Sequence, residues 1–94
     1  MVEAVVNMNN PAGLHIRLDA LLVRIAEKYA SNIWLIRNGK MANAKSIIGL
    51  MSLDIYSGTE IVIRADGIDE KLALAELVKL IRSDFAEMGG DSIL

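Results

Sequence analysis

The sequence has no cysteine and only one histidine among its 94 residues. Without cysteine there are no disulfides or thiolate metal sites, and one histidine cannot build a multi-histidine metal centre. No carboxylates are spaced as in a calcium loop, and both common glycine-rich nucleotide-binding patterns are missing. We therefore expect no metal and no cofactor. His15 is left as the residue on which chemistry can depend.

Long apolar runs are also missing. No stretch approaches the ~18 apolar residues of a membrane-spanning helix, and the first residues lack the regions of a secretory signal. We therefore expect a cytoplasmic protein with no membrane insertion. Ten Lys and Arg against twelve Asp and Glu give a net charge of -2. Such a charge has no general attraction for phosphate backbones, which argues against nucleic acid as a partner.

What is present is a hydrophobic fraction of 53% in a chain long enough for one small domain. Alternation of apolar and polar residues, or a short apolar run, predicts four strands, at 2–8, 33–37, 40–44 and 60–65. Apolar residues at helical spacing predict a helix beginning at Ile16 and another after Asp69. The stripes of these two helices are Leu18, Leu21, Leu22, Ile25 and Tyr29, and Leu74, Leu77, Val78, Ile81 and Phe85.

Turn and cap residues connect these elements. Asn38-Gly39 favours a type I′ hairpin between the second and third strands, because both residues tolerate positive φ. Ser46 is placed to cap a short helix over about 47–53, and Asp69 to cap the last helix. The order β-α-β-β-α-β-α with short connections predicts an α+β protein, an antiparallel sheet covered on one face by helices.

His15 lies at the start of the first predicted helix, two residues before Arg17. A lone histidine in this position is ordinarily a surface or capping residue. However, the free N–H groups and dipole at a helix N-terminus suit an anion, and Arg17 adds a full positive charge. Because a neutral imidazole is a competent nucleophile near pH 7, the position is compatible with accepting a phosphoryl group.

Two stretches carry a specific resemblance: GLHIR at 13–17 and KSIIGLMSL at 45–53. With NGK at 38–40 and GTEIVIRADG at 58–67, the chain resembles the HPr family, the histidine-containing phosphocarriers of the bacterial phosphoenolpyruvate:sugar phosphotransferase system. The resemblance implies an open-faced β-sandwich, a four-stranded antiparallel sheet with three helices on one face. We expect this domain at residues 1–88 and a flexible tail at 89–94.

The resemblance also implies a function. His15 would accept a phosphoryl group from enzyme I, ultimately from phosphoenolpyruvate, with Arg17 stabilising the phosphate, and would pass it to enzyme IIA components. Such a protein is a substrate of phosphotransferases rather than an enzyme, and we expect a monomer. In some members a serine matching Ser46 is phosphorylated by HPr kinase/phosphorylase, which makes the protein a corepressor with catabolite control protein. For Ser46 the alternative is a helix cap and nothing more.

The family docks its partners on a shallow apolar patch ringed by basic residues. By resemblance this patch would contain Ile16, Arg24, Ile47, Ile48 and Met51. For the apolar residues of the predicted short helix, packing in the core is an equally good interpretation.

The sequence departs from the family pattern at four positions. Ile16, Leu18 and Asp19 replace alanine, proline and alanine, and Asp54 replaces the more usual glycine. Leu18 fits the apolar stripe, whereas Ile16 adds bulk beside His15 and Asp19 adds negative charge in an aqueous setting near a phosphohistidine. Two functions therefore stay open: a working phosphocarrier, or an HPr-like regulatory module with weak or lost transfer that acts through Ser46 or its docking surface.

Overall fold

The computed structural model describes residues 1–10 and 16–83. Their secondary structure follows the predicted order. The elements are β1 (Val2–Asn7), α1 (Ile16–Ala26), β2 (Asn32–Arg37), β3 (Lys40–Asn43), α2 (Ile47–Met51), β4 (Glu60–Asp66) and α3 (Glu70–Arg82). Phe85 of the last apolar stripe, the end of the proposed domain and its tail lie outside the described residues, as does His15.

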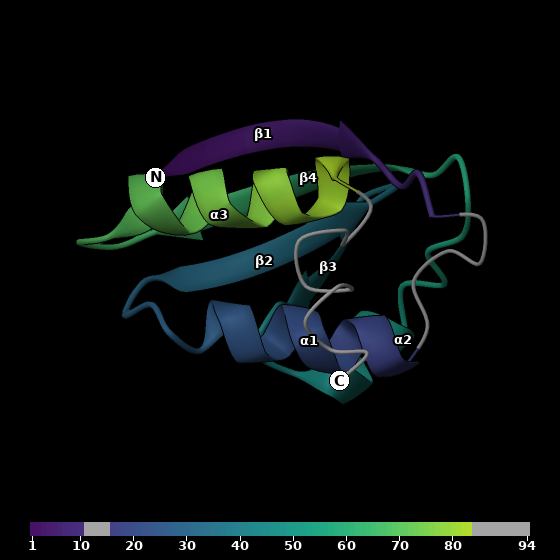
Figure 1. Ribbon diagram of the computed structural model, residues 1–94, viewed down its shortest axis with the longest axis horizontal. Coiled ribbons are helices and arrows are strands. Elements are labelled where there is room, and N and C mark those ends of the chain that lie inside the picture. Colours follow the sequence, from purple (N-terminus) through teal and green to yellow (C-terminus); the bar gives the residue numbers. More distant parts are fainter. Residues whose placement is uncertain (11–15, 84–94) are drawn as a thin grey trace.

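The four strands form one antiparallel sheet in the order β1-β4-β2-β3. β4 and β2 are the central strands, and β1 and β3 lie at the edges. Helices α1 and α3 lie in front of the strands in Figure 1, and the chain runs from α1 to α3 by way of β2, β3, α2 and β4. The α+β prediction with helices on one face is therefore confirmed.

The core lies between the sheet and the helices. Every second residue of β4 and β2 points into it, so Ile61, Ile63, Ile33 and Leu35 are at most 1% exposed. The two helical stripes meet these strands. Their buried members are Leu18, Leu22, Ile25, Leu77 and Ile81, with Leu21, Tyr29, Leu74 and Val78 partly buried against them. The periodicity of the sequence thus predicted the core face of each element.

The left-handed backbone conformation occurs in the β2–β3 hairpin, at Asn38 and Gly39, and just after α2, at Asp54. Asn38 and Gly39 have φ values of 52° and 81°, so the predicted hairpin between β2 and β3 is confirmed. Asp54, which occupies the family's glycine position, has φ of 51°. A Cβ is disfavoured in the left-handed region of backbone conformation, which glycine adopts without strain. The glycine of the family pattern therefore suits this position better than the aspartate does.

The prediction that the Asp69 side chain caps α3 is wrong. Asp69 does precede α3, but its carboxylate accepts hydrogen bonds from the backbone N–H of Ala30 (2.8 Å) and Ser31 (2.9 Å), and from the Ser31 hydroxyl. These bonds, that of the Ser31 hydroxyl first, lower the pKa of Asp69. Asp69 therefore fastens the α1–β2 connection to the start of α3, and Glu70 instead accepts from the Gly67 N–H (3.0 Å).

Candidate functional site

The first candidate element is the start of α1. The helix begins at Ile16, so residue 15 immediately precedes it in the chain, as the sequence predicted. Arg17 is exposed in the first turn, and Arg24 is exposed two turns later on the same side. Helix α1 therefore presents a basic stripe to solvent that begins two residues after His15.

The second candidate element is α2. Ser46 caps this helix: the Gly49 N–H donates to the Ser46 Oγ at 3.0 Å. Ile48 and Met51 are 78% and 47% exposed, whereas Ile47 is half-buried and packs against the core. Of the two interpretations left open for these residues, exposure is correct for Ile48 and Met51, and core packing is largely correct for Ile47.

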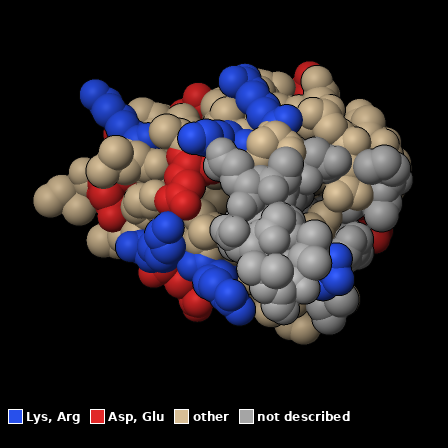
Figure 2. Space-filling view, in the orientation of Figure 1, with Lys and Arg blue, Asp and Glu red and all other residues tan. Residues whose placement is uncertain are grey.

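Helices α1 and α2 pack against each other, so their exposed residues belong to one region. We call it the α1–α2 surface: the exposed Arg17, Arg24, Ile48 and Met51, together with the half-buried capping residue Ser46. Figure 2 shows basic side chains on the side of the molecule where Figure 1 places α1. The Lys45 ammonium group donates to the Tyr29 carbonyl at 2.8 Å and joins the approach to α2 to the end of α1.

The environment of Asp19 differs from the predicted one. Its side chain is 1% exposed, and the Oδ1 atom has no hydrogen-bond partner among the described residues. Burial raises the pKa of Asp19 from 3.8 to about 6, because removal from water disfavours the charged form. The expectation of an aqueous carboxylate near His15 is thus wrong. Leu18, by contrast, is buried as expected.

Sequence reasoning missed the residue that holds the loop after α2. Arg37, at the end of β2, donates to the Leu53 carbonyl (3.1 Å) and to the Tyr56 hydroxyl (2.9 Å). Its guanidinium carbon also lies 5.1 Å from the centre of the Tyr56 ring. The contacts of Arg37 join it to residues that lie 16 and 19 positions further along the chain. Such long-range contacts leave no periodic pattern, so nothing in the sequence marked Arg37.

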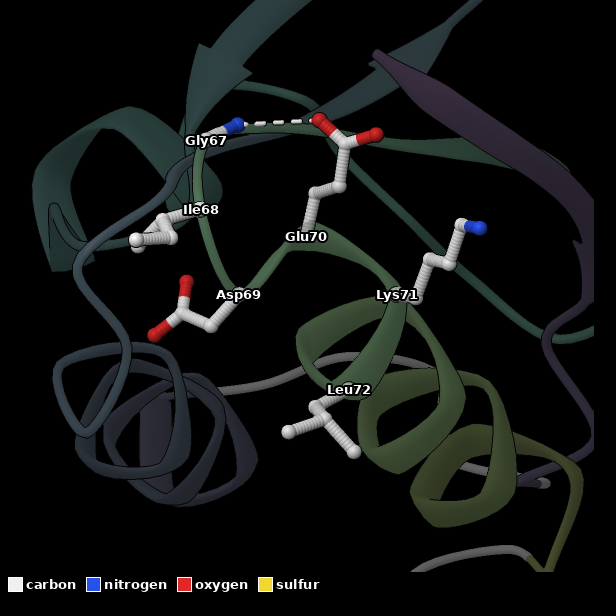
Figure 3. A pocket seen from close by; sticks show the side chains of 6 residues that line it. All are labelled: Gly67, Ile68, Asp69, Glu70, Lys71 and Leu72. Carbon is white, nitrogen blue, oxygen red and sulfur yellow. Dashed lines mark hydrogen bonds between the residues drawn. The ribbon is translucent and has the colours of Figure 1, made fainter.

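A surface depression lies elsewhere, at the connection between β4 and α3 (Figure 3). Its lining is Gly67, Ile68, Asp69, Glu70, Lys71 and Leu72. Both of its carboxylates already have partners: Asp69 binds the α1–β2 connection, and Glu70 binds Gly67 and the N-terminal ammonium group. The depression is therefore a consequence of how α3 is anchored, and we assign no ligand to it.

Residues 1–10 and 16–83 contain no helix long and apolar enough to cross a membrane. The same residues contain no group of three or more histidine and acidic side chains arranged to hold a metal ion.

Comparisons with known proteins agree with this architecture. Residues 2–83 match the family model described as the PTS HPr component phosphorylation site. The phosphocarrier protein HPr of Buchnera aphidicola is 44% identical over 81 residues, 86% of this chain and 95% of that protein.

Two solved structures have the same fold as this chain. A crystal structure of HPr from Thermoanaerobacter tengcongensis superposes with a TM-score of 0.88 at 43% identity, covering 92% of this chain and 97% of the other. Crh, the catabolite repression protein of Bacillus subtilis, gives 0.73 at 40% identity, covering 89% and 97%, and its crystal structure is a domain-swapped dimer. The expectation of a monomer therefore stays untested. The match of family model, sequence and fold over nearly the whole chain shows that this protein belongs to the HPr family of the phosphotransferase system.

Proposed function

We propose that the protein is a phosphocarrier in the cytoplasm that relays a phosphoryl group from enzyme I to enzyme IIA components. His15 is the acceptor: an imidazole nitrogen forms a bond to phosphorus as the bond to the enzyme I donor breaks, and the reverse exchange passes the group onward. The protein is a substrate in both steps rather than an enzyme, and it needs no cofactor. The observation that carries the proposal is Arg17, exposed at the start of α1 two residues after the only histidine.

Arg17 supplies the charge that this chemistry requires. A phosphoryl group on His15 brings close to two negative charges to the start of α1, where unpaired backbone N–H groups and the helix dipole favour an anion. The guanidinium is free of the core, so it can turn toward that phosphate without any loss of packing. Charge-assisted contacts of this kind contribute ~1.5–3 kcal/mol each.

Partner binding is assigned to the α1–α2 surface together with Ile16 and Ile47. Ile48 and Met51 present apolar side chains that gain from burial against a partner, and Arg17 and Arg24 supply charge beside them. Helix α2 is rigidly mounted for this role, because Leu50 is buried, Ser46 caps the helix and Arg37 holds the loop that follows.

The decisive experiment is incubation with enzyme I and phosphoenolpyruvate, followed by intact-mass measurement. We expect a gain of one phosphoryl group that is labile in acid and absent in His15→Ala. Arg17→Ala should slow transfer at least tenfold with an unchanged melting temperature, whereas Lys71→Ala, an exposed cation in the first turn of α3, should leave the rate unchanged. An unmodified wild-type protein would contradict the carrier proposal.

The same design tests the docking surface. Ile48→Ala should raise the KM for phosphorylation by enzyme I, since Ile48 loses contact area that only the complex buries. Ile68→Ala is the matched control, because Ile68 is 96% exposed but lies in the β4–α3 connection, outside the α1–α2 surface. Equal effects of the two variants would remove α2 from the docking surface.

A regulatory module is the second candidate, favoured by the likeness to Crh and by the position of Ser46 on the α1–α2 surface. Under this proposal HPr kinase/phosphorylase modifies Ser46 and the product binds catabolite control protein. Ser46→Asp keeps an N-capping oxygen but adds charge, so it should retain stability while slowing phosphorylation of His15. Ser46→Ala should instead cost about 1 kcal/mol of stability with little effect on transfer. Failure of wild type to accept from enzyme I, with modification of Ser46 by the kinase, would favour the module.

A further inference from the structure

The face of the sheet that the helices leave uncovered is apolar along a row that crosses all four strands. The register aligns Val5 of β1 with Val62 of β4, Val62 with Ile36 of β2, and Ile36 with Met41 of β3. Val5 and Met41 are 53% and 48% exposed. Because the solvated face of an antiparallel sheet is ordinarily polar, such a row needs an explanation.

Trp34, the only tryptophan, extends the apolar surface on one side of the row. It is half-buried and neighbours Arg64 of β4 and Asn43 of β3. We call the surface formed by Val5, Trp34, Ile36, Met41 and Val62 the open face. It lies on the side of the sheet away from α1 and α3, and so away from the viewer in Figure 1.

Charged residues lie on both sides of the apolar row, and the charge is positive on one side and negative on the other. Arg64 lies two residues beyond Val62 on β4 and pairs with Glu3 of β1. Glu60 lies two residues before Val62, opposite Asn7, and its side chain is exposed. Since a strand rises about 3.3 Å per residue, each charge stands roughly 7 Å from the row along the same central strand.

We propose that the open face binds the open face of a second copy of this chain, around a two-fold axis that runs along the apolar row. Rotation about that axis reverses the strand direction while it keeps each row residue against its own counterpart. Glu60 of each copy then lies opposite Arg64 of the other, at two symmetry-related places. Two features therefore favour a second copy as the partner of the open face: the apolar rows face each other, and the charges of the two copies are complementary.

The size of the surface sets the strength of the dimer. Four strands about 4.8 Å apart, each contributing about five residues, give a face of roughly 20 by 17 Å. Each copy therefore contributes on the order of 300–400 Å², well below the ~800 Å² of a standard interface. The dimer is weak, forms at high protein concentration and exchanges rapidly.

This arrangement differs from a domain-swapped dimer. Exchange of an element between copies would replace contacts that the chain otherwise makes with itself, whereas face-to-face packing leaves every strand in its own sheet. The face-to-face dimer depends on Glu60, Arg64 and Val62, and a swapped dimer has no such dependence.

The first test is sedimentation equilibrium over a concentration series, with Trp34 fluorescence as the second readout. We expect a reversible monomer–dimer equilibrium and a blue shift of Trp34 emission as the dimer forms. Val62→Lys should abolish both, whereas Leu72→Lys, which adds the same charge to an exposed leucine of α3, should leave both unchanged. A wild type that stays monomeric at millimolar concentration would overturn the proposal.

The second test uses charge reversal. Glu60→Arg and Arg64→Glu each create two like-charge pairs in a homodimer, so each should raise the dissociation constant about tenfold or more. An equimolar mixture of the two variants restores an opposite charge at both places and should dimerise as wild type does. Mixing that restores nothing, or a dimer insensitive to both substitutions, would contradict the two-fold arrangement.

Discussion

Asp19 is the residue at which burial and charge conflict most directly. Its raised pKa means that the folded protein favours the protonated acid, so the contribution of Asp19 to stability is most favourable below about pH 4 and falls as the pH rises from about 4 to about 6. The loss amounts to about 3 kcal/mol at most, since one pKa unit corresponds to ~1.4 kcal/mol. We expect Asp19→Asn to be more stable than wild type at pH 7 and to lack this fall.

Urea unfolding at a series of pH values measures the effect of Asp19→Asn, with Asp54→Asn as the control because Asp54 is exposed. Parallel profiles for wild type and Asp19→Asn would show that the Asp19 carboxyl is solvated after all. Burial also changes what we expect for transfer: any influence of Asp19 on His15 should persist at high salt, since ions do not reach a buried charge.

Gly67 shows how one missing side chain permits a close approach. A Cβ at this position would lie 2.5 Å from the Oγ and 2.6 Å from the Cα of Ser31. Gly67→Ala must therefore displace the backbone at Ser31 and disturb the bonds from Ala30 and Ser31 to Asp69. We expect a loss of about 1–3 kcal/mol in stability.

Thermal and urea unfolding would measure the loss caused by Gly67→Ala. Gly58→Ala is a matched control, because Gly58 also has positive φ but a Cβ there would meet nothing within 4 Å. If both variants lost the same stability, the contact with Ser31 would not be the cause.

The α2–β4 connection is the element in which the sequence is least well matched to the backbone. Asp54 holds a φ of 51° just after α2, with its N–H donating to the Met51 carbonyl at 3.4 Å. Asp54→Gly relieves the left-handed strain but increases the entropy of the unfolded chain, and we expect a net gain of about 0.5–1 kcal/mol. Ser57→Gly in the same loop, where φ is not positive, should reduce stability. Chemical unfolding would measure the free energy of unfolding of both variants. A destabilised Asp54→Gly would refute the strain argument.

Elements with strong periodicity were predictable from sequence, and contacts between distant side chains were not. The strand and helix limits agreed within a few residues because the apolar positions of β4 or α1 encode which face is buried. Asp69 was misassigned because an acid before a helix can cap it or bind elsewhere, and only the fold brings Ser31 within reach. Asp19 was misassigned because the residue type indicates solvent, whereas its place between Leu18 and Leu22 is buried.

At the scale of the whole molecule, the sheet separates two surfaces. Helix α1, against which α2 packs, lies on one side, and the open face lies on the other (Figure 1). We therefore expect Val62→Lys to receive a phosphoryl group from enzyme I at the wild-type rate, even at concentrations where wild type is dimeric. Initial rates at low and high protein concentration provide the measurement. A slower Val62→Lys with an unchanged melting temperature would show that the two surfaces are coupled.

The order of the strands has a consequence for synthesis of the chain. Within residues 1–10 and 16–83 the only strand that β1 adjoins is β4, and their register joins Val2 to Ala65 and Asn7 to Glu60. At ~5–20 residues per second, β4 leaves the ribosome several seconds after β1. During that interval β1 has no partner within its own polypeptide. The β2–β3 hairpin can form earlier, but the sheet cannot be completed until residues 60–66 have been translated.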